Sequence, residues 1–440
     1  MIAPLRVAVV GAGPSGLYAT GHLLEAPGGT YLDGRLQKLV DRPVEVDVFD
    51  RLSTQWGLVR HGVAPDHPEK KLVQRVFEET AARPGFRFFG RVEVGIHVSV
   101  EELRRWYDAV IFAFGAPGDS QLDIPGEALP GSIAARSFVA WYNGHPDAAD
   151  LAPDLSHERA VIVGNGNVAM DVARILTLPV DELEKTDIAP AALTALASSR
   201  IREVVVLGRR GPDHGAFNNP ELEELGRLPG VDVLVEGEVP EPAGQGEATR
   251  RKLATLRTYA ERPLAGHDKR IVLRFLGSPH EVLGTDRVTG LRIVHNRIDE
   301  GRVVPTEKIT DLDTGLVLRS IGYFGTPLAG LPFDHDRGVV PNLDGRILVN
   351  GTPVPGLYVT GWAKRGPRGI IGTNKVCSRD TVRALLSDDL GARALPAAQV
   401  EAILRQRSAD LVDHQTWLRL DAAERRAGRK LGRPRLKLVV

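Results

Sequence analysis

Arg6-Val7-Ala8-Val9-Val10-Gly11-Ala12-Gly13-Pro14-Ser15-Gly16 is the stretch of sequence that decides the fold. Its first part is apolar and rich in β-branched residues, which predicts a short strand buried in a parallel sheet, and residues 17–24 continue as a helix. Gly11 permits the tight turn between them, Gly13 lets the backbone approach a pyrophosphate, and Gly16 lets helix and strand pack closely. N–H groups at the helix N-terminus would bind the phosphates. The stretch therefore predicts a dinucleotide-binding site.

An acidic residue follows this loop at the place where a ribose hydroxyl would bind. Asp50 ends the next predicted strand, residues 44–49. The usual gap to such an acid is about 20 residues. Here the gap is longer because a polar insertion with glycine and proline, residues 25–43, intervenes, and we expect this insertion to lie on the surface. A carboxylate at this position fits FAD or NAD. The alternative is a glycine turn that only joins a strand to a helix.

The chain contains a second unit of the same kind. A predicted strand leads into Gly164-x-Gly166-x-x-Ala169, in which alanine replaces the third glycine, and a helix follows over 170–176. The next strand, 203–208, ends at Arg209 and Arg210 rather than at an acid. Paired guanidinium groups would bind a 2′-phosphate that a carboxylate would repel, so this second site fits NADP. The alternative is an exposed arginine pair on a solvated turn.

Two such units in one chain predict an α/β protein with two Rossmann-like dinucleotide-binding domains, and hydride transfer between their cofactors. Buried strands predicted at 108–115 and 356–361 lie before and after the second unit. We therefore expect an NADP-binding domain, residues 116–320, inserted into an FAD-binding domain made of residues 1–115 and 321–440.

Composition narrows the chemistry further. The 440 residues hold 56 Lys+Arg and 56 Asp+Glu, and this zero net charge argues against a nucleic-acid binder held by bulk charge. Cys377 is the only cysteine. It excludes an intramolecular disulfide, a C-x-x-C pair and the usual four-thiolate zinc and iron–sulfur sites, so we expect no metal and an organic electron carrier. No apolar run approaches the ~18 residues of a membrane span and no export signal is evident, which predicts a cytoplasmic protein. We expect a monomer.

Four longer motifs point to a family. They are GLVRHGVAPDHP at residues 57–68, LDIPGE at 122–127, GNGNVAMDVAR at 164–174 and GWAKRGP at 361–367. With them the chain resembles the ferredoxin–NADP reductases of the adrenodoxin-reductase type, mitochondrial and bacterial, from about Leu5 to about Arg433. The resemblance implies an NADPH:ferredoxin oxidoreductase, in which FAD receives a hydride at N5 and passes single electrons to an iron–sulfur protein.

The resemblance also implies site residues. For FAD they are Gly11, Gly13, Ser15, Gly16, Asp50, Leu58, Val94, Trp362, Gly369, Ile370 and Ile371. For NADP they are Asn165, Gly166, Asn167, Val168, Arg209, Arg210, Glu221 and Gly369. His67 and Glu221 would lie beside the nicotinamide, hold it and adjust proton placement as N5 accepts the hydride, without acting as covalent nucleophiles. Alternatively, His67 is a loop histidine packed between Pro65 and Pro68.

Several positions depart from the family pattern. Asp50 stands where a glutamate is common, which keeps the charge. Arg368 replaces a threonine beside the flavin, and an extra cation there could raise the flavin potential or assist the nicotinamide phosphates. His214-Gly215 and Asn218-Asn219 change the expected surroundings of the nicotinamide ribose.

An acidic ferredoxin needs a basic docking surface near the flavin. One candidate is the run Arg250-Arg251-Lys252 with Arg257 one to two helical turns later, and its alternative is a solvated helix face. Another candidate is the basic tail that contains Arg425, Arg426, Arg429 and Lys430 and runs to Lys437, which would otherwise be a surface tail.

Other functions compete with the ferredoxin reductase. A flavin reductase resembling the small subunit of glutamate synthase would serve another acceptor, but the N-terminal cluster-binding cysteines of that family are absent here. A non-catalytic FAD/NADP redox sensor would need neither His67 nor Glu221. A flavoprotein monooxygenase fits less well, and the lone Cys377 excludes a disulfide reductase.

Overall fold

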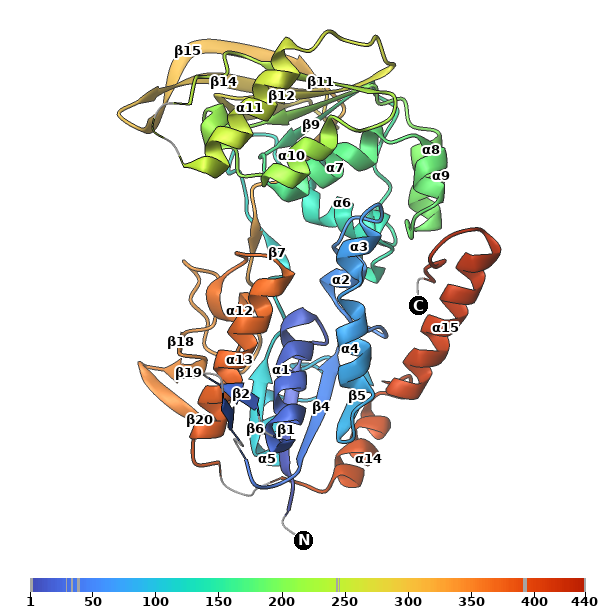
Figure 1. Ribbon diagram of the computed structural model, residues 1–440, viewed down its shortest axis with the longest axis vertical. Helices are drawn as coiled ribbons and strands as arrows, with labels where there is room; N and C mark the ends of the chain where they lie inside the picture. Colours follow the sequence, from blue (N-terminus) through green and yellow to red (C-terminus); the bar gives the residue numbers. More distant parts are fainter. Residues whose placement is uncertain are drawn as a thin grey trace.

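The computed structural model describes residues 3–28, 30–32, 35–37, 40–242, 244, 246–390 and 394–438, with only the backbone described at 30–32 and 35–37. The molecule has two lobes, each built around a mostly or wholly parallel sheet (Figure 1). The predicted α/β class is confirmed. In the insertion, β2 (Thr30–Leu32) and β3 (Arg35–Gln37) pair as a short antiparallel hairpin, and the insertion's residues 29, 33–34 and 38–39 lie outside the described residues.

Among the described residues, eight strands form the first sheet in the order β18-β19-β20-β6-β1-β4-β5-β21. Their bounds are β1 Leu5–Val10, β4 Val44–Asp50, β5 Phe86–Gly90, β6 Ala109–Phe112, β18 Asn342–Leu343, β19 Arg346–Val349, β20 Thr352–Val359 and β21 Val412–Asp413. The central strands from β20 to β5 run parallel. Along β1, Val7 and Val9 pack into one hydrophobic cluster and Ala8 and Val10 into another. Successive side chains of a strand point to opposite faces, so this sheet is buried on both sides.

Helices cover the two faces of the first sheet. One face carries α1 (Pro14–Glu25), α4 (Gln74–Ala81), α13 (Ile371–Ser387) and α15 (His414–Lys430), and the other carries α5 (Val100–Trp106) and α14 (Ala397–Arg407). The apolar side chains that they bury include Leu17, Phe77, Leu385 and Trp417 on the first face. At ~25 cal/mol per Å² of buried apolar area, these clusters supply the main stabilisation of the lobe.

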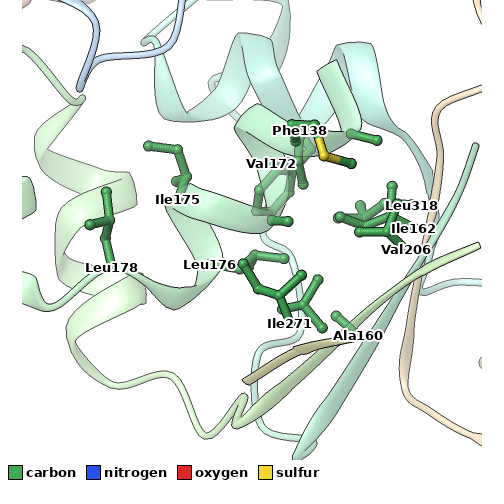
Figure 2. Packing of buried hydrophobic residues seen from close by; sticks show 14 of the residues in the cluster. Phe138, Ala160, Ile162, Val172, Ile175, Leu176, Leu178, Val206, Ile271 and Leu318 are labelled. Atoms are coloured by element: carbon green, nitrogen blue, oxygen red, sulfur yellow. The ribbon is translucent and has the colours of Figure 1, made fainter. Parts of the chain in front are cut away.

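The second sheet is parallel throughout, in the order β11-β12-β10-β9-β16-β8. Its strands are β8 Ser132–Ala134, β9 Arg159–Val163, β10 Glu203–Leu207, β11 Val231–Glu236, β12 Lys269–Arg274 and β16 Leu316–Arg319. On one face pack α6 (Ala135–Tyr142), α7 (Asn167–Thr177), α9 (Pro190–Ala197), α10 (Asn219–Leu225) and α11 (Glu247–Glu261). Figure 2 shows this core, where Phe138, Val172 and Leu176 meet Ile162, Val206 and Ile271 of the sheet.

A three-stranded antiparallel sheet covers the other face of the second sheet. It consists of β13 (Gly277–Leu283), β14 (Gly290–Asp299) and β15 (Arg302–Asp313). Val205 and Leu207 of β10 pack in one cluster with Leu291 and Ile293 of β14. The sequence analysis did not predict these strands.

The chain crosses between the lobes along β7 (Gly118–Asp119) and returns along β17 (Tyr323–Phe324), and these two short strands pair antiparallel. The first sheet is therefore built from residues 5–112 and 342–413, and the second sheet from residues 132–319. This distribution of strands supports the proposed division into residues 1–115 with 321–440 and residues 116–320.

A C-terminal segment, residues 433–438, joins the two lobes after α15 (Figure 1). Arg433 donates to the backbone oxygens of Thr186 and Ile188 in the second lobe, at 3.0 and 2.7 Å. Lys437 donates to Arg60 O at 3.1 Å in the first lobe and to Asn143 Oδ1 at 2.9 Å in the second. The alternative that this tail is a surface segment is wrong for Arg433, Arg435 and Lys437, which are buried and bonded to oxygens of the protein.

In the part of the chain that the structure describes, no helix is both long enough and apolar enough to cross a bilayer.

Candidate active site

The loop after β1 has the geometry that a pyrophosphate requires. Gly11 has a φ of +112°, and a Cβ on it would lie 2.5 Å from Ala113 O. A Cβ on Gly16 would lie 1.9 Å from Gly11 O, so both positions exclude a side chain. Gly13 differs, because the nearest atom to an added Cβ is Gly57 Cα, at 3.9 Å. The space beside Gly13 is open, and no side chain caps the N-terminus of α1 there.

The loop after β9 repeats this arrangement. Gly164 has a φ of +108°, and a Cβ on it would lie 2.2 Å from Ser320 O. Gly166 has no atom within 4 Å of an added Cβ among the described residues, so the space beside it is open, as it is beside Gly13. It precedes α7, whose N-terminus has no side-chain cap, while Ala169 is buried in the helix–sheet contact and Val168 packs beside it. Both second glycines thus leave a cradle for an anionic group.

Asp50 lies directly against the first glycine loop. Its carboxylate accepts hydrogen bonds from the backbone N–H groups of Ala12, at 2.8 Å, and Leu52, at 2.9 Å. Burial raises the pKa of Asp50, and these two N–H groups oppose the rise. The acid is therefore held beside the loop, where the sequence predicts it at a ribose.

The residues predicted around the flavin come from three further segments. Leu58 begins α2 (Leu58–His61), and the preceding Gly57 approaches Gly13 so closely that an added Cβ would lie 2.8 Å from Gly13 Cα. Ser15 donates to Asn374 Oδ1 of α13 at 3.0 Å. A Cβ on Gly361 would lie 2.0 Å from Ser15 Oγ, which brings the start of α12 (Trp362–Arg365) to the loop.

Two side chains of this region have features that a bound ligand would explain, a donor without an acceptor and an exposed apolar group. Trp362 Nε1 is buried and has no hydrogen-bond partner among the described residues, and its ring lies 5.2 Å from that of Tyr323. Ile370, just before α13, is 66% exposed, beside the left-handed Gly369 and exposed Arg368. Ile371 is the first residue of α13. Val94, in contrast, is buried in the cluster that contains Val10 and Ala363.

At the end of β10, Arg209 and Arg210 are exposed. Their backbone oxygens accept from Asn296 Nδ2, at 2.9 Å, and Leu276 N, at 3.1 Å, so the turn is anchored to the antiparallel sheet. Neither guanidinium group has an ion-pair partner within the described part of the chain. Both cations are therefore available to a phosphate.

Two asparagines tie the loop before α10 to the second glycine loop. Asn165 Oδ1 accepts from Ala216 N, at 3.4 Å, and Asn167 Oδ1 accepts from Asn218 N, at 2.8 Å. His214 pairs with Asp213 at 2.9 Å, and Asn219 donates to Ala248 O. Asn218, one of the positions that depart from the family pattern, thus lies against the predicted nucleotide loop, while His214 and Asn219 contact other residues.

His67 lies where the two lobes meet, just before α3 (Pro68–Lys71), which reaches toward α6 and α7 (Figure 1). Its side chain is 3% exposed. Nε2 contacts both carboxylate oxygens of Glu224 in α10 at 2.9 Å. Nδ1 contacts Lys70 Nζ at 3.0 Å and Arg174 Nη2 of α7 at 3.4 Å. His67 is therefore not a histidine merely packed between prolines.

Arg174 is the buried centre of this cluster. It is fully buried and pairs with Asp66 at 2.6 Å, Asp171 at 2.9 Å and Glu224 at 3.3 Å. Burial acts to lower the pKa of Arg174, but the carboxylates, Asp66 first, outweigh it and raise that pKa. Asp66 belongs to the first lobe and Arg174 to the second, so this pair ties the lobes together beside His67.

Glu221 does not contact His67 directly. Its Oε1 accepts from Lys70 Nζ at 3.3 Å, and Oε2 is buried without a partner among the described residues. The residue that binds His67 is Glu224, one helical turn later, which was not among the predicted site residues. The spacing of three residues between the two glutamates on α10 is the sequence signal that could have identified it.

The predicted basic patch on α11 is smaller than its sequence suggests. Arg251 pairs with both oxygens of Glu223 at 2.5 and 2.7 Å, and Arg257 pairs with Glu241 at 3.1 Å. Lys252 is half-buried, donates to Gly215 O and lies 5.1 Å from the Phe217 ring centre. Arg250 is exposed. Carboxylates therefore neutralise part of this surface.

Comparison with known proteins agrees with this geometry. Residues 5–213 match the family of pyridine nucleotide-disulphide oxidoreductases. The chain is 47% identical to the NADPH-ferredoxin reductase FprA of Mycobacterium tuberculosis, over 99% of this chain and 97% of that protein. It is 42% identical to the mitochondrial NADPH:adrenodoxin oxidoreductase of Bos taurus, over 99% of this chain and 90% of that protein. The structure of Mycobacterium tuberculosis FprA in complex with NADPH superposes with a TM-score of 0.92 at 46% identity, covering 99% of this chain and 98% of that one.

Proposed function

Because the chain belongs to the ferredoxin–NADP reductase family of the adrenodoxin-reductase type, we propose that it binds FAD and NADPH and passes electrons from NADPH to a ferredoxin-type iron–sulfur protein. One observation carries this proposal from the structure itself. Each lobe has a glycine loop whose second glycine, Gly13 or Gly166, leaves open space at an uncapped helix N-terminus. Asp50 is hydrogen-bonded to the first glycine loop. Arg209 and Arg210 follow β10, the strand that pairs with β9 at the second glycine loop.

The residues of the first lobe fit FAD. Gly11, Gly13 and Gly16 would admit the pyrophosphate, and Asp50 would hold the ribose. The unpartnered Trp362 Nε1 and the exposed backbone from Gly369 to Ile371 offer donors to an isoalloxazine, with Ser15, Leu58 and Val94 completing the predicted set. When bound, a flavin accepts a hydride and releases electrons singly, which a nicotinamide cannot do.

The residues of the second lobe fit NADPH. Asn165, Gly166, Asn167 and Val168 would surround the pyrophosphate, and Arg209 and Arg210 would bind the 2′-phosphate. Glu221 Oε2, buried and unpartnered, offers an acceptor to a ribose hydroxyl. The arginine pair would select NADPH over NADH, because only the former carries the phosphate.

The chain's own residues would organise the hydride transfer. His67 is buried between the lobes and bonds through Nε2 to the partly exposed Glu224, so this pair can hold a proton at His67 Nε2. Arg174 and Asp66 link the lobes and would fix the spacing between the two nucleotides. Near-attack separations of ~3–3.5 Å demand such positioning.

An acidic iron–sulfur protein remains the proposed electron acceptor. Arg250 is the exposed member of the α11 patch that we propose to take part in docking, and electrostatic steering would act mainly on the association rate. The cytoplasm and a monomeric state are proposed on the same sequence grounds as above.

The test is NADPH-driven reduction of cytochrome c by the purified holoprotein, with and without an added bacterial ferredoxin. We expect a large ferredoxin-dependent rate with NADPH and a much smaller rate with NADH. A Gly166→Ala variant, which fills the second cradle, is the matched control and should lose the NADPH-driven rate while retaining FAD. Reduction of the flavin without stimulation by ferredoxin would instead point to another acceptor, and binding of both nucleotides without any transfer would favour the redox sensor.

A further inference from the structure

Lys70 occupies a position between two functional groups. Its Nζ lies 3.0 Å from His67 Nδ1 and 3.3 Å from Glu221 Oε1. The side chain is 40% exposed, so it reaches the pair from the solvent side of α3. Lys70 is not among the residues assigned to either nucleotide above.

The contacts of His67 define where its ring proton lies. Nε2 faces both oxygens of Glu224, which as a carboxylate can only accept. Nδ1 faces Lys70 Nζ and Arg174 Nη2, which can only donate. Nδ1 must therefore accept, and Nε2 must carry the proton. These contacts favour a single tautomer of the ring.

Every charged group around the ring bears on this state. Glu224 lies on the Nε2 side, while Lys70 and Arg174 lie on the Nδ1 side, with Asp171 Oδ1 farther from Nδ1 at 3.8 Å. Asp66 is paired with Arg174, so its carboxylate does not accept a proton from Nδ1. If Lys70 were absent, Nδ1 would lose its nearest donor, and Asp171 would be the nearest acceptor for a proton on Nδ1.

The second contact of Lys70 concerns Glu221. Lys70 satisfies Oε1 and leaves Oε2 buried and without a partner among the described residues. A buried carboxylate oxygen without a donor is costly, so this geometry orients one oxygen toward an incoming hydroxyl group. The same ammonium thus presents Glu221 to a nucleotide and sets the form of His67.

We propose that Lys70 is a positioning residue of the NADPH site: it keeps the ring proton of His67 on Nε2, and it anchors Glu221 with Oε2 free to accept from the nucleotide. This inference rests on the proposed function for the identity of the nucleotide. The form of the His67 ring is nevertheless a property of the protein without turnover.

The test compares the holoprotein with Lys70→Met, which removes the charge, and Lys70→Arg, which keeps it. Selective ¹⁵N-histidine labelling and long-range ¹H–¹⁵N spectra distinguish the two neutral tautomers and the imidazolium, and His67→Gln assigns the signal. We expect the wild-type ring to show the Nε2–H tautomer. In Lys70→Met the Nδ1–H tautomer should become populated and the dissociation constant for NADP⁺ should rise about three- to tenfold. Lys70→Arg should restore both properties.

Lys185→Met is the matched control, because Lys185 is an exposed lysine paired with a glutamate, Glu182, at 2.7 Å. It should leave the His67 signal and NADP⁺ binding unchanged. A wild-type ring protonated at Nδ1, or a Lys70→Met variant with the wild-type ring signal over the whole pH range, would overturn the inference. Failure of ferredoxin reduction in a protein that binds NADP⁺ would overturn the proposed function instead, while the ring signal would still decide the role of Lys70.

Discussion

Arg209 and Arg210 are exposed cations. Within the described residues their backbone oxygens accept hydrogen bonds, while their guanidinium groups have no partner. The double substitution Arg209→Ala/Arg210→Ala should weaken the use of NADPH and leave the use of NADH unchanged. A hydrogen bond to a charged group contributes about 1.5–3 kcal/mol. Loss of two such contacts should lower kcat/KM for NADPH by roughly 100-fold or more. Steady-state kinetics with both nucleotides measure this difference.

A matched substitution beside the same strand controls for effects on the fold. Arg202→Ala removes an exposed arginine just before β10, whose side chain bonds, among the described residues, to the nearby backbone oxygens of Ser199 and Ile201. It should change neither nucleotide's kinetics. An equal fall for NADPH and NADH in the double variant would contradict the assignment of the 2′-phosphate.

At the residue scale, short motifs carried most of the prediction. The glycine positions, Asp50 and the arginine pair could be recognised because each lies a few residues from a predicted strand end. Two partners of His67 could not, since Arg174 of α7 and Glu224 of α10 lie 107 and 157 residues away along the chain. Only folding brings them to the ring beside Lys70, which is three residues from His67.

The two loop–helix elements make a prediction that separates binding from folding. Gly13 and Gly166 have φ values of −82° and −84°, which any residue adopts, and their added Cβ atoms would meet no close neighbour. Gly13→Ala should therefore leave the unfolding free energy within about 0.5 kcal/mol of wild type, as for other unstrained surface changes. It should nevertheless purify with little FAD. Absorbance of bound flavin and thermal unfolding of the apoprotein measure the two effects.

Gly16→Ala is the contrasting control in the same loop. Its Cβ would lie 1.9 Å from Gly11 O, so it should destabilise the fold as well as the binding of FAD. If Gly13→Ala retained full FAD, the cradle would not be the pyrophosphate site.

At the element scale, the strands that flank the two glycine loops were predicted almost to the residue, whereas the strand predicted at 356–361 is found at Thr352–Val359. The predicted strand 6–10 is found as Leu5–Val10 and the predicted strand 203–208 as Glu203–Leu207. The helix predicted over 170–176 is longer, Asn167–Thr177, because the helix begins inside the glycine loop itself. The antiparallel sheet was missed, since β15 is largely exposed and contains Pro305, so it lacks a regular apolar alternation.

At the scale of the whole molecule, a buried charge network fixes the C-terminal segment that joins the two lobes. Glu424 of α15 is fully buried and accepts from both terminal nitrogens of Arg60, at 2.8 and 2.6 Å, and from Arg435 at 3.1 Å. Glu424→Gln would leave buried cations without their anion. Removing one partner of such a pair costs about 3–5 kcal/mol, and denaturant unfolding should show a loss of that size. Glu182→Gln, at an exposed pair, should cost no more than about 1 kcal/mol.

A further set of buried ion pairs, between Asp187 and two lysines, predicts a stability that depends on pH. Burial acts to raise the pKa of Asp187, but the ammonium groups of Lys437 and Lys71 outweigh it and lower that pKa to about 2, from 3.8. Two cations share this one carboxylate, and burial correspondingly lowers the pKa of each lysine. Asp187 therefore stabilises the fold fully above pH ~4, and this contribution is lost as the pH falls through 3.8 toward 2.

The difference in unfolding free energy between wild type and Asp187→Asn measures this contribution. It should be largest near pH 7 and shrink by about 2 kcal/mol between pH 5 and pH 2, since one pKa unit corresponds to 1.36 kcal/mol. A difference that stayed constant over this range would show that Asp187 carries the same charge in the folded and unfolded protein.

The strands of the second sheet lie, in sequence, between strands of the first sheet, and this order has a consequence for biosynthesis. Phe112 at the end of β6 pairs with Val359 of β20, which is translated 247 residues later. At about 5–20 residues per second, the ribosome needs roughly 12–50 s to supply that strand. During this interval the edge of β6 and the face of α1 that α13 will cover remain open, and unpaired edges of this kind recruit other chains. High-level production of this protein should therefore depend on chaperones that cover the open edge of β6 until β20 has been translated.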